Sequence, residues 1–75
     1  MPREQRVDLV AEMVANVLEV SVEVGATVAV GDEVALLESM KMEIPVVSEA
    51  AGTVAAIKVA PGDVVQEGDV LISLV

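Results

Sequence analysis

Apolar and polar residues alternate along much of this chain with the two-residue period of half-buried β-strands. Residues 18–22 show the pattern most clearly, because Glu19 and Ser21 separate three apolar residues. Such alternation predicts one face packed against a core and one face in contact with solvent. Residues 7–18 fit helical spacing equally well. We predict strands there, because valine is a poor helix former and no capping motif opens the stretch.

The strand pattern occurs twice, because the chain aligns with itself at an offset of 37 residues. Each copy is predicted to run strand, glycine turn, short strand, Gly-Asp turn and strand. Two copies related by a pseudo-two-fold axis predict an all-β fold, a flattened barrel or sandwich of two antiparallel four-stranded sheets. The matched pairs include Val17 with Val54, Leu18 with Ala55, Val20 with Ile57, Val22 with Val59, Gly25 with Gly62, Gly31 with Gly68, Asp32 with Asp69 and Leu37 with Leu74.

All five glycines are predicted to occupy structural turns: Gly25, Gly31, Gly52, Gly62 and Gly68. Glycine permits a positive φ, and an aspartate beside it bonds local backbone amides. A phosphate-binding role is disfavoured, because within each copy the glycines lie six residues apart and none opens a predicted helix.

A chain of 75 residues has room for one small domain with one core. Residues 7–75 are predicted to form this domain, and the polar residues 1–6 to fray at its N-terminus. Aromatic residues are absent and valine occurs 18 times, so the core is expected to consist of Val, Leu, Ile and Ala with some Met.

Charge and side-chain inventory exclude several classes of function. A net charge of -9 disfavours nucleic acid and anionic membranes as partners and favours basic protein surfaces. With no signal-peptide core and no membrane-spanning apolar run, we expect a soluble, cytoplasmic protein. Cysteine and histidine are absent, so no catalytic residue is predicted; a serine nucleophile would need Lys41 or Lys58 as its base. No metal site is predicted either, because the acids Asp32, Asp63, Glu67 and Asp69 have the spacing of turn residues and match no calcium loop.

Lys41 lies between two apolar stretches, residues 34–37 and 44–47. Their short connection predicts a β-hairpin with Lys41 at or beside its tip. Met40 and Met42 flank the lysine, and exposed methionines are typical of surfaces that other proteins bind. The alternative, that these two methionines fill gaps in the core, remains open from the sequence.

The segment Glu38-Ser39-Met40-Lys41-Met42 resembles the biotinylation motif of the biotinyl domains of biotin-dependent carboxylases, a family related to lipoyl domains. The usual motif is Ala-Met-Lys-Met, and Ser39 stands here in place of the alanine. The resemblance extends over residues 14–75. It is closest to the small stand-alone biotin/lipoyl attachment proteins of bacteria, because no insertion corresponding to the protruding thumb of some carriers separates the second and third strands.

The resemblance implies the sandwich fold and a biotin carboxyl carrier with biotin covalently attached to Lys41. It implies a non-catalytic protein that a biotin protein ligase modifies and that shuttles a carboxyl group from a biotin carboxylase to a carboxyltransferase acting on an acyl-CoA or related acceptor. We expect the isolated chain to be a monomer. The expected ligase-recognition residues are Glu38, Ser39, Met40, Met42 and Glu43.

Two other functions use the same fold. A lipoyl carrier is disfavoured, because aspartate typically precedes the modified lysine of lipoyl domains and methionines flank Lys41. An interaction module without a cofactor remains the second alternative. Lys58 is predicted to lie in mid-strand on the polar face as an ordinary solvated charge.

Overall fold

Eight strands and their connecting turns form over residues 6–75, the part of the chain that the computed structural model describes. They build two four-stranded antiparallel sheets, with strand orders β1-β8-β6-β3 and β5-β4-β2-β7. The predicted all-β sandwich is therefore confirmed. The predicted fraying concerns residues 1–6, of which 1–5 lie outside the described residues. The strands are β1 (Val7–Val10), β2 (Ala15–Val20), β3 (Thr27–Val28), β4 (Glu33–Ser39), β5 (Met42–Val47), β6 (Gly52–Ile57), β7 (Val64–Val65) and β8 (Val70–Leu74).

The two sequence copies exchange their short strands. Strand β3 of the first copy pairs with β6 of the second, and β7 of the second pairs with β2 of the first. Equivalent backbone bonds accompany the exchange: Gly25 N–H donates to the Val54 carbonyl, and Gly62 N–H donates to the Val17 carbonyl, each at 2.8 Å. Each copy therefore supplies hydrogen-bond partners that the other copy requires.

The Gly-Asp turns have matching geometry in the two copies. Gly31 has a φ of 92° and Gly68 a φ of 91°, as the repeat predicts. Beside them, Asp32 Oδ2 accepts the Ala29 N–H and Asp69 Oδ2 accepts the Gln66 N–H, both at 2.9 Å. The glycines are needed because a side chain rarely adopts this φ.

Gly52 does not occupy a turn, so that prediction was wrong. It is the first residue of β6, where a Cβ atom would lie 2.8 Å from the Val75 carbonyl oxygen. Glycine is required there by the close approach of another strand, which no local sequence pattern indicates.

The predicted alternation of residues 18–22 fails at Leu18. The pairing of β2 with β4 shifts register between Val17 and Glu19, and β6 shifts at the equivalent position, around Ala55. A β-bulge of this kind inserts one unpaired residue and resets the faces that follow. Val17 is therefore buried at 1% exposure and Leu18 is 38% exposed, while Val20 still packs against the core.

Valine, leucine, isoleucine and alanine make up the apolar core between the two sheets. No methionine of residues 6–75 is among them, contrary to the expectation of some Met in the core. Two buried polar side chains are satisfied: Ser73 Oγ donates to Asp8 Oδ1 at 2.8 Å, and Ser48 Oγ donates to the Ala50 carbonyl. The core residues are Leu9, Ala11, Ala15, Val17, Val28, Val34, Ala35, Leu37, Val54, Val65, Leu71, Ile72 and Leu74.

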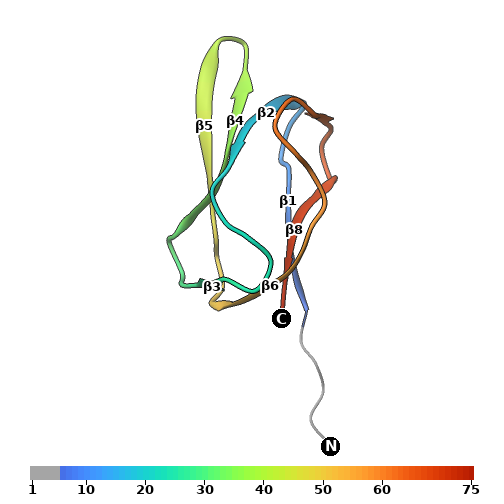
Figure 1. The fold of residues 1–75 in the computed structure, drawn as a ribbon. Coiled ribbons are helices and arrows are strands. Elements are labelled where there is room, and N and C mark those ends of the chain that lie inside the picture. Colours follow the sequence, from blue (N-terminus) through green and yellow to red (C-terminus); the bar gives the residue numbers. More distant parts are fainter. Residues whose placement is uncertain (1–5) are drawn as a thin grey trace, which may run out of the picture.

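The β4–β5 hairpin extends beyond the rest of the sandwich at one end of the molecule (Figure 1). At the opposite end, the start of β1 and the end of β8 lie side by side, with Val7 paired to Leu74. Nothing within residues 6–75 forms a helix that is long and apolar enough to cross a membrane.

Candidate functional site

The tip of the β4–β5 hairpin is a two-residue turn made of Met40 and Lys41. Ser39 and Met42 are the last paired residues of the two strands. Met40 has a φ of 54° and Lys41 a φ of 67°, and positive φ at both central residues is the signature of a type I′ turn. Asparagine and glycine normally fill such turns, since other side chains cost on the order of 1 kcal/mol each. This hairpin therefore places two unfavourable residue types at its tip.

The methionines on either side of Lys41 face solvent. Met40 is 91% exposed and Met42 is 66% exposed, and Lys41 itself is exposed. The prediction of a lysine at an exposed hairpin tip is confirmed, and the alternative that these methionines fill the core is wrong. Two large apolar side chains at an exposed hairpin tip of an acidic protein form a surface suited to a partner.

The two glutamates next to this turn lie on one face of the hairpin. Glu38 and Glu43 are directly opposite each other, on the face away from the row that Ser39 and Met42 share with Leu37 and Ile44. Like charges in this arrangement repel. The face of the hairpin that carries Met42, Leu37 and Ile44 is thus largely apolar. The opposite face, which carries the two glutamates, is acidic.

Lys41 supplies a primary amine on a flexible stem, which is the nucleophile required for forming an amide. The side-chain hydrogen bonds among residues 6–75 all lie away from this hairpin, in other turns and between β1 and β8. The described residues also contain no cluster of three potential metal ligands. Within the described residues, the site therefore presents a primary amine on a protruding hairpin turn, with no catalytic groups arranged around that amine.

Lys58 has a different setting. It follows β6, which ends at Ile57, so the prediction of a mid-strand position was wrong. The Lys58 N–H donates to the Leu71 carbonyl at 2.8 Å, and its side chain is exposed between the half-buried Ile57 and Val59. Lys58 therefore lacks both the hairpin tip and the exposed methionines that distinguish Lys41.

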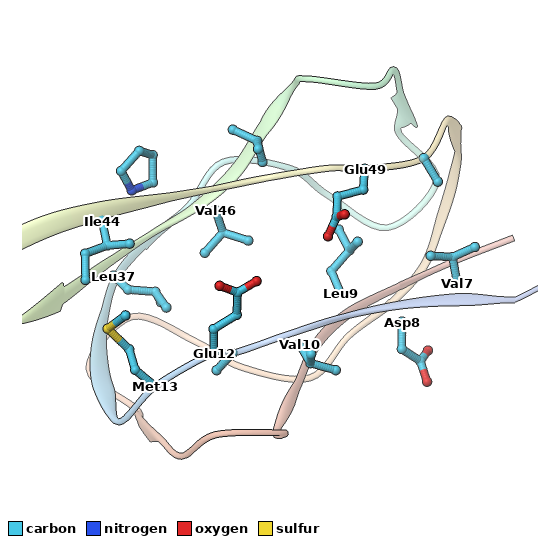
Figure 2. A pocket seen from close by; sticks show the side chains of 14 residues that line it. Val7, Asp8, Leu9, Val10, Glu12, Met13, Leu37, Ile44, Val46 and Glu49 are labelled. Carbon is cyan, nitrogen blue, oxygen red and sulfur yellow. The ribbon is translucent and has the colours of Figure 1, made fainter.

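A separate groove of about 620 Å³ lies between β1 and β5, the edge strands of different sheets (Figure 2). Leu37, Ile44 and Met13 line the end that leads toward the hairpin, and Figure 2 shows the carboxylates of Glu12 and Glu49 directed into the space between the strands. The sequence did not predict this groove, because nothing in a local pattern shows that two strands from different sheets will face each other.

Both edges of the groove resist the addition of another strand. Pro45 in β5 has no N–H to donate, and β1 contains a register shift between Leu9 and Val10. The groove also contains no amine or hydroxyl nucleophile among its lining residues. The hairpin tip therefore remains the site with distinctive chemistry.

Comparison with known proteins gives consistent results. The family model Biotin_lipoyl, described as "Biotin-requiring enzyme", matches residues 7–74. The chain is 53% identical over 64 residues to the biotinylated protein TB7.3 homolog of Mycobacterium leprae, covering 85% of this chain and 90% of that protein. It is 49% identical over 63 residues to the biotin/lipoyl attachment protein of Bacillus subtilis, covering 84% and 86%.

Solved structures give the same picture at the level of the fold. The urea carboxylase of Kluyveromyces lactis superimposes with a TM-score of 0.89 and 29% identity. The match covers 100% of this chain and 7% of that chain, so the resemblance is to one small part of a much longer protein.

Proposed function

Because this chain belongs to the biotin- and lipoyl-attachment domain family, we propose that it is a biotin carboxyl carrier whose biotin is attached to Lys41. The observation that carries the proposal is the position of Lys41 in a protruding two-residue turn between two exposed methionines. The covalent cofactor implied by the family requires a free primary amine, and this turn holds one beyond the surface of the sandwich.

Attachment would convert the amine of Lys41 into an amide. The deprotonated Nζ attacks the carbonyl carbon of an activated biotinyl group, an N–C bond forms, and the activating group leaves while the nitrogen loses a proton. The hairpin does not itself provide a base, so we assign deprotonation and activation to a biotin protein ligase. Met40 and Met42 would supply the apolar contacts with that ligase, and Glu38, Ser39 and Glu43 the polar ones.

The role of the folded chain is to present the modified lysine to two other active sites. When bound, biotin supplies a ureido nitrogen that accepts and releases a carboxyl group. The lysyl stem gives reach, and the sandwich below keeps the attachment point fixed relative to the rest of the molecule. Tethering raises the local concentration of the cofactor at each site well above that of free biotin.

We infer that the partners are a biotin carboxylase and a carboxyltransferase acting on an acyl-CoA or related acceptor. The fold match to part of a carboxylase supports this class of partner. The blunted edges at Pro45 and in β1 support a chain that is monomeric when isolated. A lipoyl carrier is not favoured, because Met40 occupies the position that aspartate typically has before the lysine of lipoyl domains.

Intact-mass measurement after incubation with biotin, ATP and a biotin protein ligase tests the proposal. The wild-type chain should gain one biotinyl group and shift completely on a streptavidin gel. Lys41→Arg should gain none, and the matched variant Lys58→Arg should be modified like the wild type. A parallel reaction with lipoate and a lipoate ligase should leave the mass unchanged. Modification of Lys41→Arg, or lipoylation in preference to biotinylation, would contradict the proposal.

A further inference from the structure

We propose that Met40 and Met42 are a redox-sensitive modification site, at which oxidation of the two thioethers to sulfoxides prevents attachment at Lys41 and leaves the fold intact. This inference rests on the proposed function, since its readout is the modification of Lys41. It concerns the chain before attachment, because oxidation of the methionines does not break an amide that has already formed.

The composition of the chain restricts where an oxidant can react. Cysteine, histidine, tryptophan and tyrosine are all absent, and the chain contains four methionines. Thioethers are therefore the side chains that a peroxide oxidises most readily in this protein. Peroxide oxidation, which cysteine and methionine share in most proteins, is directed here to methionine.

The structure places this chemistry at the hairpin tip. Of the methionines within residues 6–75, Met40 is 91% exposed, Met42 is 66% exposed and Met13 is 40% exposed. The accessibility of the sulfur should set the order of reaction, with Met40 first and Met13 last. The two most accessible thioethers are thus the immediate neighbours of Lys41.

The fold should tolerate their oxidation. None of these three methionines belongs to the buried core, which consists of Val, Leu, Ile and Ala. The Met40–Lys41 turn depends on backbone geometry, and the Ser39–Met42 pair that closes it is joined through the main chain. A sulfoxide oxygen on either methionine can remain hydrated, so no unpaired polar group is buried in the free protein.

Binding of a ligase is different, because it removes the same side chains from water. The oxidant transfers one oxygen atom to sulfur: for a peroxide, the O–O bond breaks, an S–O bond forms, water leaves, and the sulfur is oxidised by two electrons. The product is a polar sulfoxide in place of a flexible apolar thioether. A ligase surface that fits two thioethers would have to dehydrate two sulfoxides. Thiol-dependent methionine sulfoxide reductases reverse the reaction, releasing water and forming a disulfide in the reductase.

The experiment uses the unmodified chain, because biotin carries an oxidisable thioether of its own. The chain is treated with hydrogen peroxide, the peroxide is removed, and peptide mapping assigns each added oxygen to a methionine. The initial rate of biotinylation is then measured with untreated ligase. We expect kcat/KM to fall about tenfold or more when Met40 and Met42 are both oxidised, with an unchanged thermal unfolding midpoint. Treatment with both reductase types should restore the rate.

The double variant Met40→Leu with Met42→Leu is the matched control. It keeps two apolar side chains at the tip and retains Met1 and Met13 as oxidisable groups, so peroxide should leave its rate of biotinylation unchanged. The Met13→Leu variant keeps both methionines at the tip, so its rate of biotinylation should fall on oxidation as that of the wild type does. If the leucine variant is itself a poor substrate, the loss and the reductase-dependent recovery of the wild-type rate still decide the question.

Three results would overturn the inference: an undiminished rate in a chain fully oxidised at Met40 and Met42, a leucine variant that loses its rate on oxidation as the wild type does, or unfolding of the oxidised chain. A chain that is not biotinylated before any oxidation contradicts the proposed function instead, so the two failures are distinguishable.

Discussion

Glu38 and Glu43 lie directly opposite each other on strands β4 and β5, one residue pair below the Ser39–Met42 pair that closes the turn carrying Lys41. Cross-strand pairs of like charge destabilise a sheet. An offset of 37 residues relates Glu38 to Val75 and Glu43 to Arg6, so the fold itself does not require an acidic pair. We interpret the acidic pair as part of the surface that a partner protein contacts.

Replacing Glu43 with glutamine should stabilise the isolated chain, because it removes the repulsion across the hairpin. The expected gain in the free energy of unfolding is a few tenths of a kcal/mol at low ionic strength, and it should shrink as salt screens the charges. Urea denaturation at two salt concentrations measures it. Glu33→Gln is the control, because Glu33 is opposite Val47 and only the net charge changes. An equal gain in both variants would show that the pair has no specific role.

Two substitutions of Lys41 should separate its chemistry from the strain of its backbone. Lys41→Ala should abolish biotinylation and change the free energy of unfolding by no more than about 0.5 kcal/mol, because an exposed side chain is removed and the positive φ remains. Lys41→Gly should also abolish biotinylation, but it should raise the free energy of unfolding by about 0.5 kcal/mol. Glycine relieves the strain of the positive φ, and the larger backbone entropy that glycine loses on folding offsets part of this gain. A loss of several kcal/mol in the alanine variant would mean that Lys41 is structural.

Replacing Met40 and Met42 together with glutamine should slow biotinylation about tenfold or more while changing the free energy of unfolding by less than about 1 kcal/mol. The reason is that both side chains are largely in water in the free protein and would be buried only against a ligase. Initial rates of attachment and a urea denaturation curve give the two quantities. Unfolding of the double variant would show instead that the methionines support the hairpin.

The substitution Gly68→Val should lower the free energy of unfolding by about 1–2 kcal/mol, because the φ of 91° is unfavourable for a β-branched residue. A steric clash is not the reason, since open space surrounds the Cβ position. Gly31→Val should cost a similar amount, since the two turns are equivalent. The control is Gln66→Val in the same turn, which has no positive φ and should change little. Thermal or urea unfolding measures all three. Clearly different losses at Gly31 and Gly68 would contradict the equivalence of the turns.

The sequence predicted the parts of this structure that depend on local chemistry. Gly31 and Gly68 sit in equivalent turns because a glycine followed by an aspartate encodes its own geometry. The position of Lys41 followed from two apolar strands joined by a short connection. These are short-range signals, and the Gly-Asp signal was strengthened because it occurs in both copies.

The errors arose where distant segments decide the outcome. Leu18 lies in a bulge set by its pairing with β4, and Gly52 is glycine because the Val75 carbonyl passes close to it. The groove between β1 and β5 depends on how two sheets are placed. Each of these features is a relation between residues far apart in the chain, and a pattern read along the chain does not contain it.

The exchange of short strands between the two copies has a consequence for the time at which this protein can be modified. During synthesis, the β4–β5 hairpin leaves the ribosome before β7, yet β7 pairs with β2 in the same sheet, and Gly62 bonds to Val17. Pairings this distant form late, so we expect Lys41 to become a substrate only after β7 has left the ribosome. Nascent chains stalled on ribosomes before β7 emerges should therefore resist biotinylation, and efficient modification of such chains would contradict this timing.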